Sequence, residues 1–253
     1  MPVRNRDARK VRDNHAGRGG LHGAHKACDR RWHVIRWLLL DASGVLFTMH
    51  HGARLRSIAA RCDPSMTSGH IDRTIWRSGL DGLFDAGYFS ETEILDELTR
   101  RFGYRGSVAD LREDWCAGFT LVDELLDLID ELAPAVRLAV LSDNGPLLLA
   151  SIPARFPRLF RAAEHIVFSC EMGVCKPARL AFETAIATLK VTDRTEVLFV
   201  DDLDSNCVAA RRLGLRAHQF SSTQRLRQAL RLLSSVPDDA EGAPQCVGDV
   251  PRR

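Results

Sequence analysis

The sequence predicts an α/β protein with a doubly wound parallel sheet and a helical segment inserted after the first strand. Its short apolar runs lack polar alternation, which is typical of strands covered on both faces. In the second half of the chain these runs alternate with helical patterns, as in a parallel sheet with crossover helices. Between the first two runs lies a long stretch of helical periodicity without a strand signal of comparable strength.

The predicted elements follow one another along the chain. The first strand covers about 35–40, and the helical pattern covers about 53–132, where Ser90 is an expected N-cap. Further strands are expected at 136–142, 165–169, 195–200 and 216–220, and further helices at 178–189, 205–213 and 224–233. The predicted domains are a Rossmann-like core (33–48 and 133–234), a helical cap (49–132), a basic tail (1–32) and a flexible C-terminal tail (235–253).

Composition limits the class of protein. The seven cysteines are odd in number, irregularly spaced and without a C-x-x-C pair, so they indicate neither a disulfide framework nor a zinc site. Cysteines without such a pattern are expected to be reduced thiols, which predicts a cytoplasmic protein. No apolar stretch approaches the ~20 residues of a membrane span. The composition of the basic tail, with almost no large apolar side chains, predicts disorder. No aromatic interleaving or binding fold accompanies its basic residues, so nucleic acid is not an expected partner. Oligomeric state is not predicted.

Four predicted strands end in, or lead into, polar residues that can form a site. These residues are Asp41, Ser142, Lys176, Asp201 and Asp202. The carboxyl ends of parallel strands share one edge of the sheet, where ligands bind. Three carboxylates there would repel one another unless a hard cation such as Mg²⁺ lay among them. An aspartate can attack phosphorus, while a hydroxyl and an ammonium group hold the phosphoryl oxygens, so the chemistry that fits is phosphoryl transfer.

These residues carry a resemblance to the haloacid dehalogenase-like (HAD) superfamily, over about residues 35–221. Residues 39–46 (LLDASGVL) resemble its first motif, 140–142 (VLS) the second and 173–177 (GVCKP) the third. Residues 198–202 (LFVDD), together with Asn206, Ala209, Ala210 and Gly214, resemble the fourth. The helical insertion corresponds to the C1-type cap of this superfamily. Its residues 84–90 (FDAGYFS) are similar to the cap segment of the epoxide-hydrolase-phosphatase-like and dehalogenase-like subgroup.

The resemblance implies a role for each site residue. Asp41 is expected to be the nucleophile, with Ser142 holding the phosphoryl group and Lys176 steadying both. The implied ligands of Mg²⁺ are Asp41, the backbone carbonyl of Ser43, Asp202, and Asp201 directly or through water. The residues expected to contact substrate are Ser43, Gly44 and Asn144.

Two departures from the family pattern bear on activity. Phosphatases of the family carry a second aspartate two residues after the nucleophile as general acid and base, and Ser43 stands there instead. Such catalysis contributes ~10²–10⁴-fold, so turnover is expected to be slow. Asp143 stands where many relatives have Asn, which adds negative charge beside the phosphate site unless Asn144 takes that role.

The leading prediction is a Mg²⁺-dependent hydrolase of the phosphatase type, acting on a small phosphorylated metabolite. The alternative is a HAD-fold binding or regulatory protein without turnover. A carbon–halogen hydrolase is a third hypothesis, which the sequence favours less. Dehalogenases of the family need no metal, and their fourth motif lacks the paired acids found at 201–202.

Overall fold

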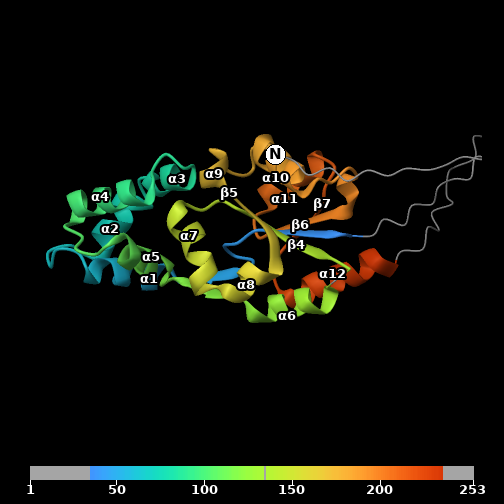
Figure 1. The fold of residues 1–253 in the computed structure, drawn as a ribbon, viewed down its shortest axis with the longest axis horizontal. Helices are drawn as coiled ribbons and strands as arrows, with labels where there is room; N and C mark the ends of the chain where they lie inside the picture. Colours follow the sequence, from blue (N-terminus) through green and yellow to red (C-terminus); the bar gives the residue numbers. More distant parts are fainter. Residues whose placement is uncertain (1–34, 134, 236–253) are drawn as a thin grey trace, which may run out of the picture. The chain divides into compact units, whose positions relative to one another are not determined.

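A computed structural model describes residues 35–133 and 135–235 (Figure 1). The predicted basic tail and nearly all of the predicted C-terminal tail lie outside the described residues. Among the described helices, none combines the length and the apolar character that crossing a membrane requires.

Five parallel strands form the central sheet, in the order β5-β4-β1-β6-β7. They are β1 (Trp37–Leu40), β4 (Arg137–Ser142), β5 (Ala163–Phe168), β6 (Val197–Asp201) and β7 (Arg216–Gln219). The central strand β1 pairs with β4 on one side and β6 on the other, so that Leu40 is in register with both Val140 and Val200. The next residue of each strand therefore reaches the same edge of the sheet.

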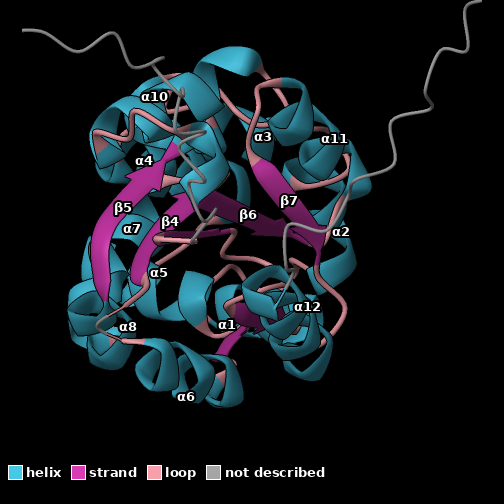
Figure 2. Cartoon of the chain, turned by 90° about the vertical axis from the view of Figure 1, so that its right-hand side faces the viewer, coloured by secondary structure: helices cyan, strands magenta, loops and turns pink. Residues whose placement is uncertain are grey.

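Both faces of the sheet are covered by helices, as Figure 2 shows. Trp37 and Leu39 face one apolar cluster with α10 (Arg179–Leu189) and α11 (Asp204–Arg212). Leu38 and Leu40 face a second cluster with α7 (Pro146–Arg155), α8 (Pro157–Ala162) and α12 (Thr223–Ser235). Alternate side chains of one strand thus reach opposite cores, which explains why β1 is apolar throughout. The predicted doubly wound α/β fold is confirmed.

The segment inserted between β1 and β4 is largely helical. Its helices are α1 (His51–Ala60), α2 (Ser68–Ile75), α3 (Leu80–Asp85), α4 (Glu91–Phe102) and α5 (Val108–Cys116). The predicted N-cap is present, because the Ser90 side chain and Glu93 form a capping box at the start of α4. We refer to α1–α5 as the insertion. A short helix in the core, α9 (Ser169–Met172), follows β5 and comes near α3.

The segment predicted as wholly helical contains a strand. β2 (Phe47–Met49) and β3 (Phe119–Leu121) form an antiparallel ribbon that joins the insertion to the core at both ends. Three-residue strands are too short to show a period of two, which is why the sequence did not reveal them. After the ribbon, α6 (Asp123–Leu132) packs against α8 and α12 of the core. The boundaries 49–132 for a cap stay a prediction, and these contacts favour an earlier end.

Candidate active site

Asp41 lies directly after the central strand, where the chain turns. Its backbone N–H donates to the carbonyl of Val200 at 2.9 Å, which extends the β1–β6 pairing by one residue. The turn that follows is closed by the N–H of Phe47, which donates to the carbonyl of Ala42 at 2.8 Å. Asp41 is only 7% exposed, so its carboxyl group is held in a largely dehydrated place. Burial, with a further contribution from Asp201, raises its pKa, and Lys176 opposes that shift.

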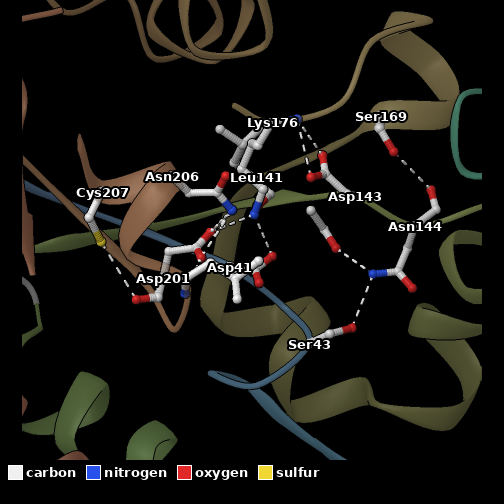
Figure 3. A network of polar contacts seen from close by, with 12 residues as sticks. Asp41, Ser43, Leu141, Asp143, Asn144, Ser169, Lys176, Asp201, Asn206 and Cys207 are labelled. Carbon is white, nitrogen blue, oxygen red and sulfur yellow. Dashed lines mark hydrogen bonds and ion pairs between the residues drawn. The ribbon is translucent and has the colours of Figure 1, made fainter. Parts of the chain in front are cut away.

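Lys176 joins the two buried carboxylates, as Figure 3 shows. Its Nζ lies 2.7 Å from Oδ1 of Asp41, 2.8 Å from Oδ2 of Asp201 and 3.1 Å from the carbonyl oxygen of Leu141. Burial alone would lower the pKa of this ammonium group. Asp41 and Asp201 outweigh that effect and hold the Lys176 pKa above its usual value. The lysine is therefore a fixed positive charge between the ends of β1 and β6.

The two neighbouring carboxylates of Asp201 and Asp202 have different surroundings. Asp201 is completely buried and accepts hydrogen bonds from Nδ2 of Asn206, at 3.1 and 3.0 Å to its two oxygens, and from the N–H of Leu203 at 2.9 Å. Asp202 is partly exposed, and burial together with the charge of Asp201 raises its pKa. Asp201 is thus held by protein donors on several sides, while Asp202 can reach solvent or a ligand.

The carboxylates of Asp41, Asp201 and Asp202 form a group that can hold a cation. One oxygen of each lies within 4.8 Å of the others, and the described residues contain no second such group of three potential ligands. Gly44 lets the backbone pass close to this group, because a Cβ there would lie 2.4 Å from Oδ2 of Asp202. Its φ of +84° also favours glycine. Hard oxygen ligands at this spacing suit Mg²⁺.

Ser142 and Asn144 form the opposite wall of the site, at the end of β4. Nδ2 of Asn144 donates to Oγ of Ser142 at 2.8 Å and to Oγ of Ser43 at 3.2 Å (Figure 3). The two oxygens of Asp143 instead accept from the backbone N–H of Lys176 at 3.0 and 3.1 Å. The carboxylate of Asp143 is thus turned to the loop that carries Lys176, and Asn144 is the side chain that joins the hydroxyls.

The structure brings all of the sequence-predicted site residues to one edge of the sheet. It also adds groups for which the sequence predicts no role. Asn206 fixes Asp201, and its place within the fourth motif was a usable signal. Ser169, at the start of α9, donates its hydroxyl to the carbonyl of Asp85 at 2.6 Å and approaches that of Asn144 at 3.5 Å. No local sequence pattern marked Ser169, because its partners lie far away in the chain.

Solved structures resemble this fold. No protein-family model and no curated protein matches the sequence. A predicted HAD-like family hydrolase from Porphyromonas gingivalis is 26% identical and has a TM-score of 0.67, over 81% of this chain and 100% of its own. A HAD family enzyme from Bacteroides thetaiotaomicron, solved as a magnesium complex, is 20% identical, with a TM-score of 0.65, over 78% and 98%. This chain has a HAD-superfamily fold.

A third similar structure is a dehalogenase. The L-2-haloacid dehalogenase from Xanthobacter autotrophicus is 19% identical and has a TM-score of 0.52, over 80% of this chain and 84% of its own. At this identity the likeness concerns the fold alone. The subgroup suggested by residues 84–90 therefore stays a prediction.

Proposed function

We propose that this protein is a Mg²⁺-dependent HAD hydrolase of the phosphatase type, which acts on a small phosphorylated metabolite through Asp41. The observation that carries the proposal is the buried Lys176 ammonium group, which bridges Asp41 and Asp201 beside a third carboxylate. A lysine placed between the proposed nucleophile and carboxylates that can bind a metal ion suits a substrate that brings further negative charge. The Bacteroides thetaiotaomicron enzyme has also been crystallised with magnesium and inorganic phosphate.

In the proposed reaction a carboxylate oxygen of Asp41 attacks phosphorus. The bond from phosphorus to the ester oxygen breaks, and that oxygen leaves as the alcohol after it takes a proton. Water then attacks the phosphorus of the aspartyl-phosphate, gives up a proton to solvent and releases inorganic phosphate from Asp41. Lys176 offsets the charge at the nucleophile, while the Ser142 hydroxyl and the Asn144 amide orient the phosphoryl oxygens.

Asp41, Asp202, the backbone carbonyl of Ser43 and, directly or through water, Asp201 would hold the Mg²⁺ ion. When bound, the ion would offset charge that develops on the transferred phosphoryl group. The grouped oxygens and the raised pKa of Asp202 support this assignment, because carboxylates crowded together are stabilised in their ionised form by a cation.

Ser43 shapes the proposed kinetics. Its hydroxyl cannot protonate the leaving oxygen or activate water as a second aspartate would, so both proton transfers fall to solvent. Esters with good leaving groups need no acid in the first step and should phosphorylate Asp41 readily. The second step still lacks a base. We therefore expect the aspartyl-phosphate to accumulate.

There are two alternatives to this proposed phosphatase function. Ser43 favours the hypothesis of a HAD-fold binding or regulatory protein that holds a phosphorylated ligand without turnover. The dehalogenase neighbour supports the fold rather than halide chemistry, and the paired acids at 201–202 favour phosphoryl transfer over carbon–halogen cleavage.

Phosphate release from 4-nitrophenyl phosphate, with and without Mg²⁺, separates these hypotheses. The proposal predicts slow release that requires Mg²⁺ and that disappears in Asp41→Asn. If the wild-type protein binds phosphate and Mg²⁺ but never releases phosphate from any of a panel of esters, the binding hypothesis replaces the proposal. Release of halide from 2-haloacids without metal would instead support the dehalogenase hypothesis.

A further inference from the structure

The insertion holds a buried guanidinium group that has no carboxylate in contact. Arg54 lies on α1 and is only 6% exposed. Its Nε donates to the carbonyl of Trp115 at 3.0 Å, and its Nη2 approaches Sδ of Met49, a weak acceptor, at 3.4 Å. Within the described part of the chain, Arg54 forms no ion pair and its Nη1 makes no hydrogen bond. Buried charges are ordinarily paired, so this one lacks its usual partner.

Aromatic rings fix the position of this guanidinium. Its central carbon lies 4.7 Å from the ring centroid of Phe119, 5.1 Å from that of Trp115 and 5.5 Å from that of Trp76. Burial lowers the Arg54 pKa to about 10, so the group stays charged at neutral pH. A guanidinium has five N–H donors, and most of those on Arg54 are unused. The result is a rigid, largely buried cation with unused N–H donors.

Two carboxyl groups on α3 interact with Arg54 without touching it. Asp81 and Asp85 are both near enough for their charges to influence the Arg54 pKa, yet neither forms an ion pair with it. Burial raises the pKa of both groups, and that of Asp85 reaches about 7. A carboxyl group that is partly neutral at physiological pH is a weak partner for a guanidinium. Asp85 is therefore a weak partner for Arg54, and neither Asp85 nor Asp81 forms an ion pair with it.

Of these two carboxyl groups, Asp85 also lies close to the candidate active site. Oδ1 of Asp85 lies 3.4 Å from the position that a Cβ on Gly145 would occupy, and Gly145 directly follows Asn144. The carbonyl of Asp85 accepts the Ser169 hydroxyl, which also approaches the carbonyl of Asn144. The end of α3 thus covers the loop after Ser142. Arg54, on α1 of the insertion, is near enough to Asp85 for the two charges to interact.

We propose that Arg54 binds a second anionic group of the substrate, so that the preferred substrate is a phosphate monoester that also carries a carboxylate. This inference rests on the phosphoryl site proposed above. A carboxylate would form two parallel hydrogen bonds with the planar guanidinium group of Arg54 and supply its missing counter-charge. Met49 belongs to the ribbon strand that leads from the Asp41 turn into α1, so Arg54 is held in a fixed relation to the nucleophile loop. Arg54 is therefore a specificity-determining residue.

Binding of non-hydrolysable phosphonates tests this inference without turnover. Calorimetry with Mg²⁺ would compare benzylphosphonate, 4-carboxybenzylphosphonate and 1,4-xylylene bisphosphonate, for the wild type and Arg54→Met. We expect the wild type to bind the carboxylated probe at least about 10-fold more tightly than the plain one, because a buried ion pair is gained. Arg54→Met should lose that preference and keep its affinity for benzylphosphonate. A preference for the bisphosphonate instead would overturn the carboxylate assignment.

Two further variants keep the test decisive. Arg56→Met removes an exposed arginine from the same helix and should leave all affinities unchanged. If Arg54→Met does not fold, Arg54→Lys can replace it. This variant keeps the charge but loses the paired N–H donors of the guanidinium, and it should reduce the carboxylate preference by at least about 3-fold. Equal wild-type binding of the carboxylated and plain probes overturns the inference on Arg54 alone. Failure of every phosphonate to bind overturns the phosphoryl site as well.

Discussion

In the proposed reaction, Ser43 occupies the position from which a second aspartate would supply acid and base catalysis. Its Oγ accepts a hydrogen bond from Nδ2 of Asn144 at 3.2 Å, so the side chain points to the wall of the site that Ser142 forms. A carboxylate in the same place could accept that hydrogen bond and also transfer protons. We predict that Ser43→Asp raises the rate of phosphate release by roughly 100-fold. Steady-state kinetics, with Ser43→Ala as the control, would measure this, and an inert Ser43→Asp enzyme would show that the missing acid is not the limit.

Gly44 lets the turn after Asp41 approach Asp202 closely. In Gly44→Ala the new methyl group would meet Oδ2 of Asp202, and the carboxylate would have to move. We predict at least about 10-fold weaker Mg²⁺ binding by calorimetry, since a ligand is displaced. Gly173→Ala is the matched control, because Gly173 also has a positive φ of +70° but no atom within 4 Å of its Cβ position. Similar Mg²⁺ affinity in both variants would argue against Asp202 as a ligand.

At the scale of elements, the junction between α3 and α9 holds the insertion against the core. A Cβ on Gly87 would lie 2.1 Å from the carbonyl oxygen of Cys170, so the two backbones meet without room for a side chain. We predict that Gly87→Ala lowers the melting temperature by at least about 3 °C more than Gly79→Ala. Gly79 has a similar φ of +81° and open space around it. Equal melting temperatures would mean that this contact contributes little to stability.

The secondary-structure elements differ in how well the sequence predicts them. The strands β1, β4 and β6 are predictable because they are buried and apolar, and their ends carry the polar residues of the site. The ribbon of β2 and β3 is too short for any periodicity. The predicted elements also omit α7 and α8, two helices that each begin with a proline. The contacts of Ser169 and Asp85 join residues far apart in the chain, and only the fold brings them together.

At the scale of the whole molecule, buried carboxyl groups make stability depend on pH. Burial, with a contribution from Asp81, raises the Asp85 pKa from 3.8 to about 7. The unfolded chain releases this proton near pH 4 and the folded chain near pH 7, so the contribution of Asp85 to stability is lost as pH rises between them. Asp85→Asn removes this loss. We predict that thermal melts show a larger gain in melting temperature for Asp85→Asn at pH 8 than at pH 4.

An equal effect of Asp85→Asn at both pH values would contradict this account of Asp85. The comparison between variant and wild type is needed because the Asp41 pKa is also raised and would contribute to the pH dependence of both proteins.

Phosphorylation of Asp41 can be detected from the mass of the acid-quenched protein. The wild type would be mixed with Mg²⁺ and 4-nitrophenyl phosphate, quenched within the first turnovers and digested for mass spectrometry. Because Ser43 leaves the second step without a base, we predict that the peptide with Asp41 gains one phosphoryl group and that Asp41→Asn gains none. Release of phosphate with no adduct on Asp41, or an adduct on another residue, would show that Asp41 is not the nucleophile.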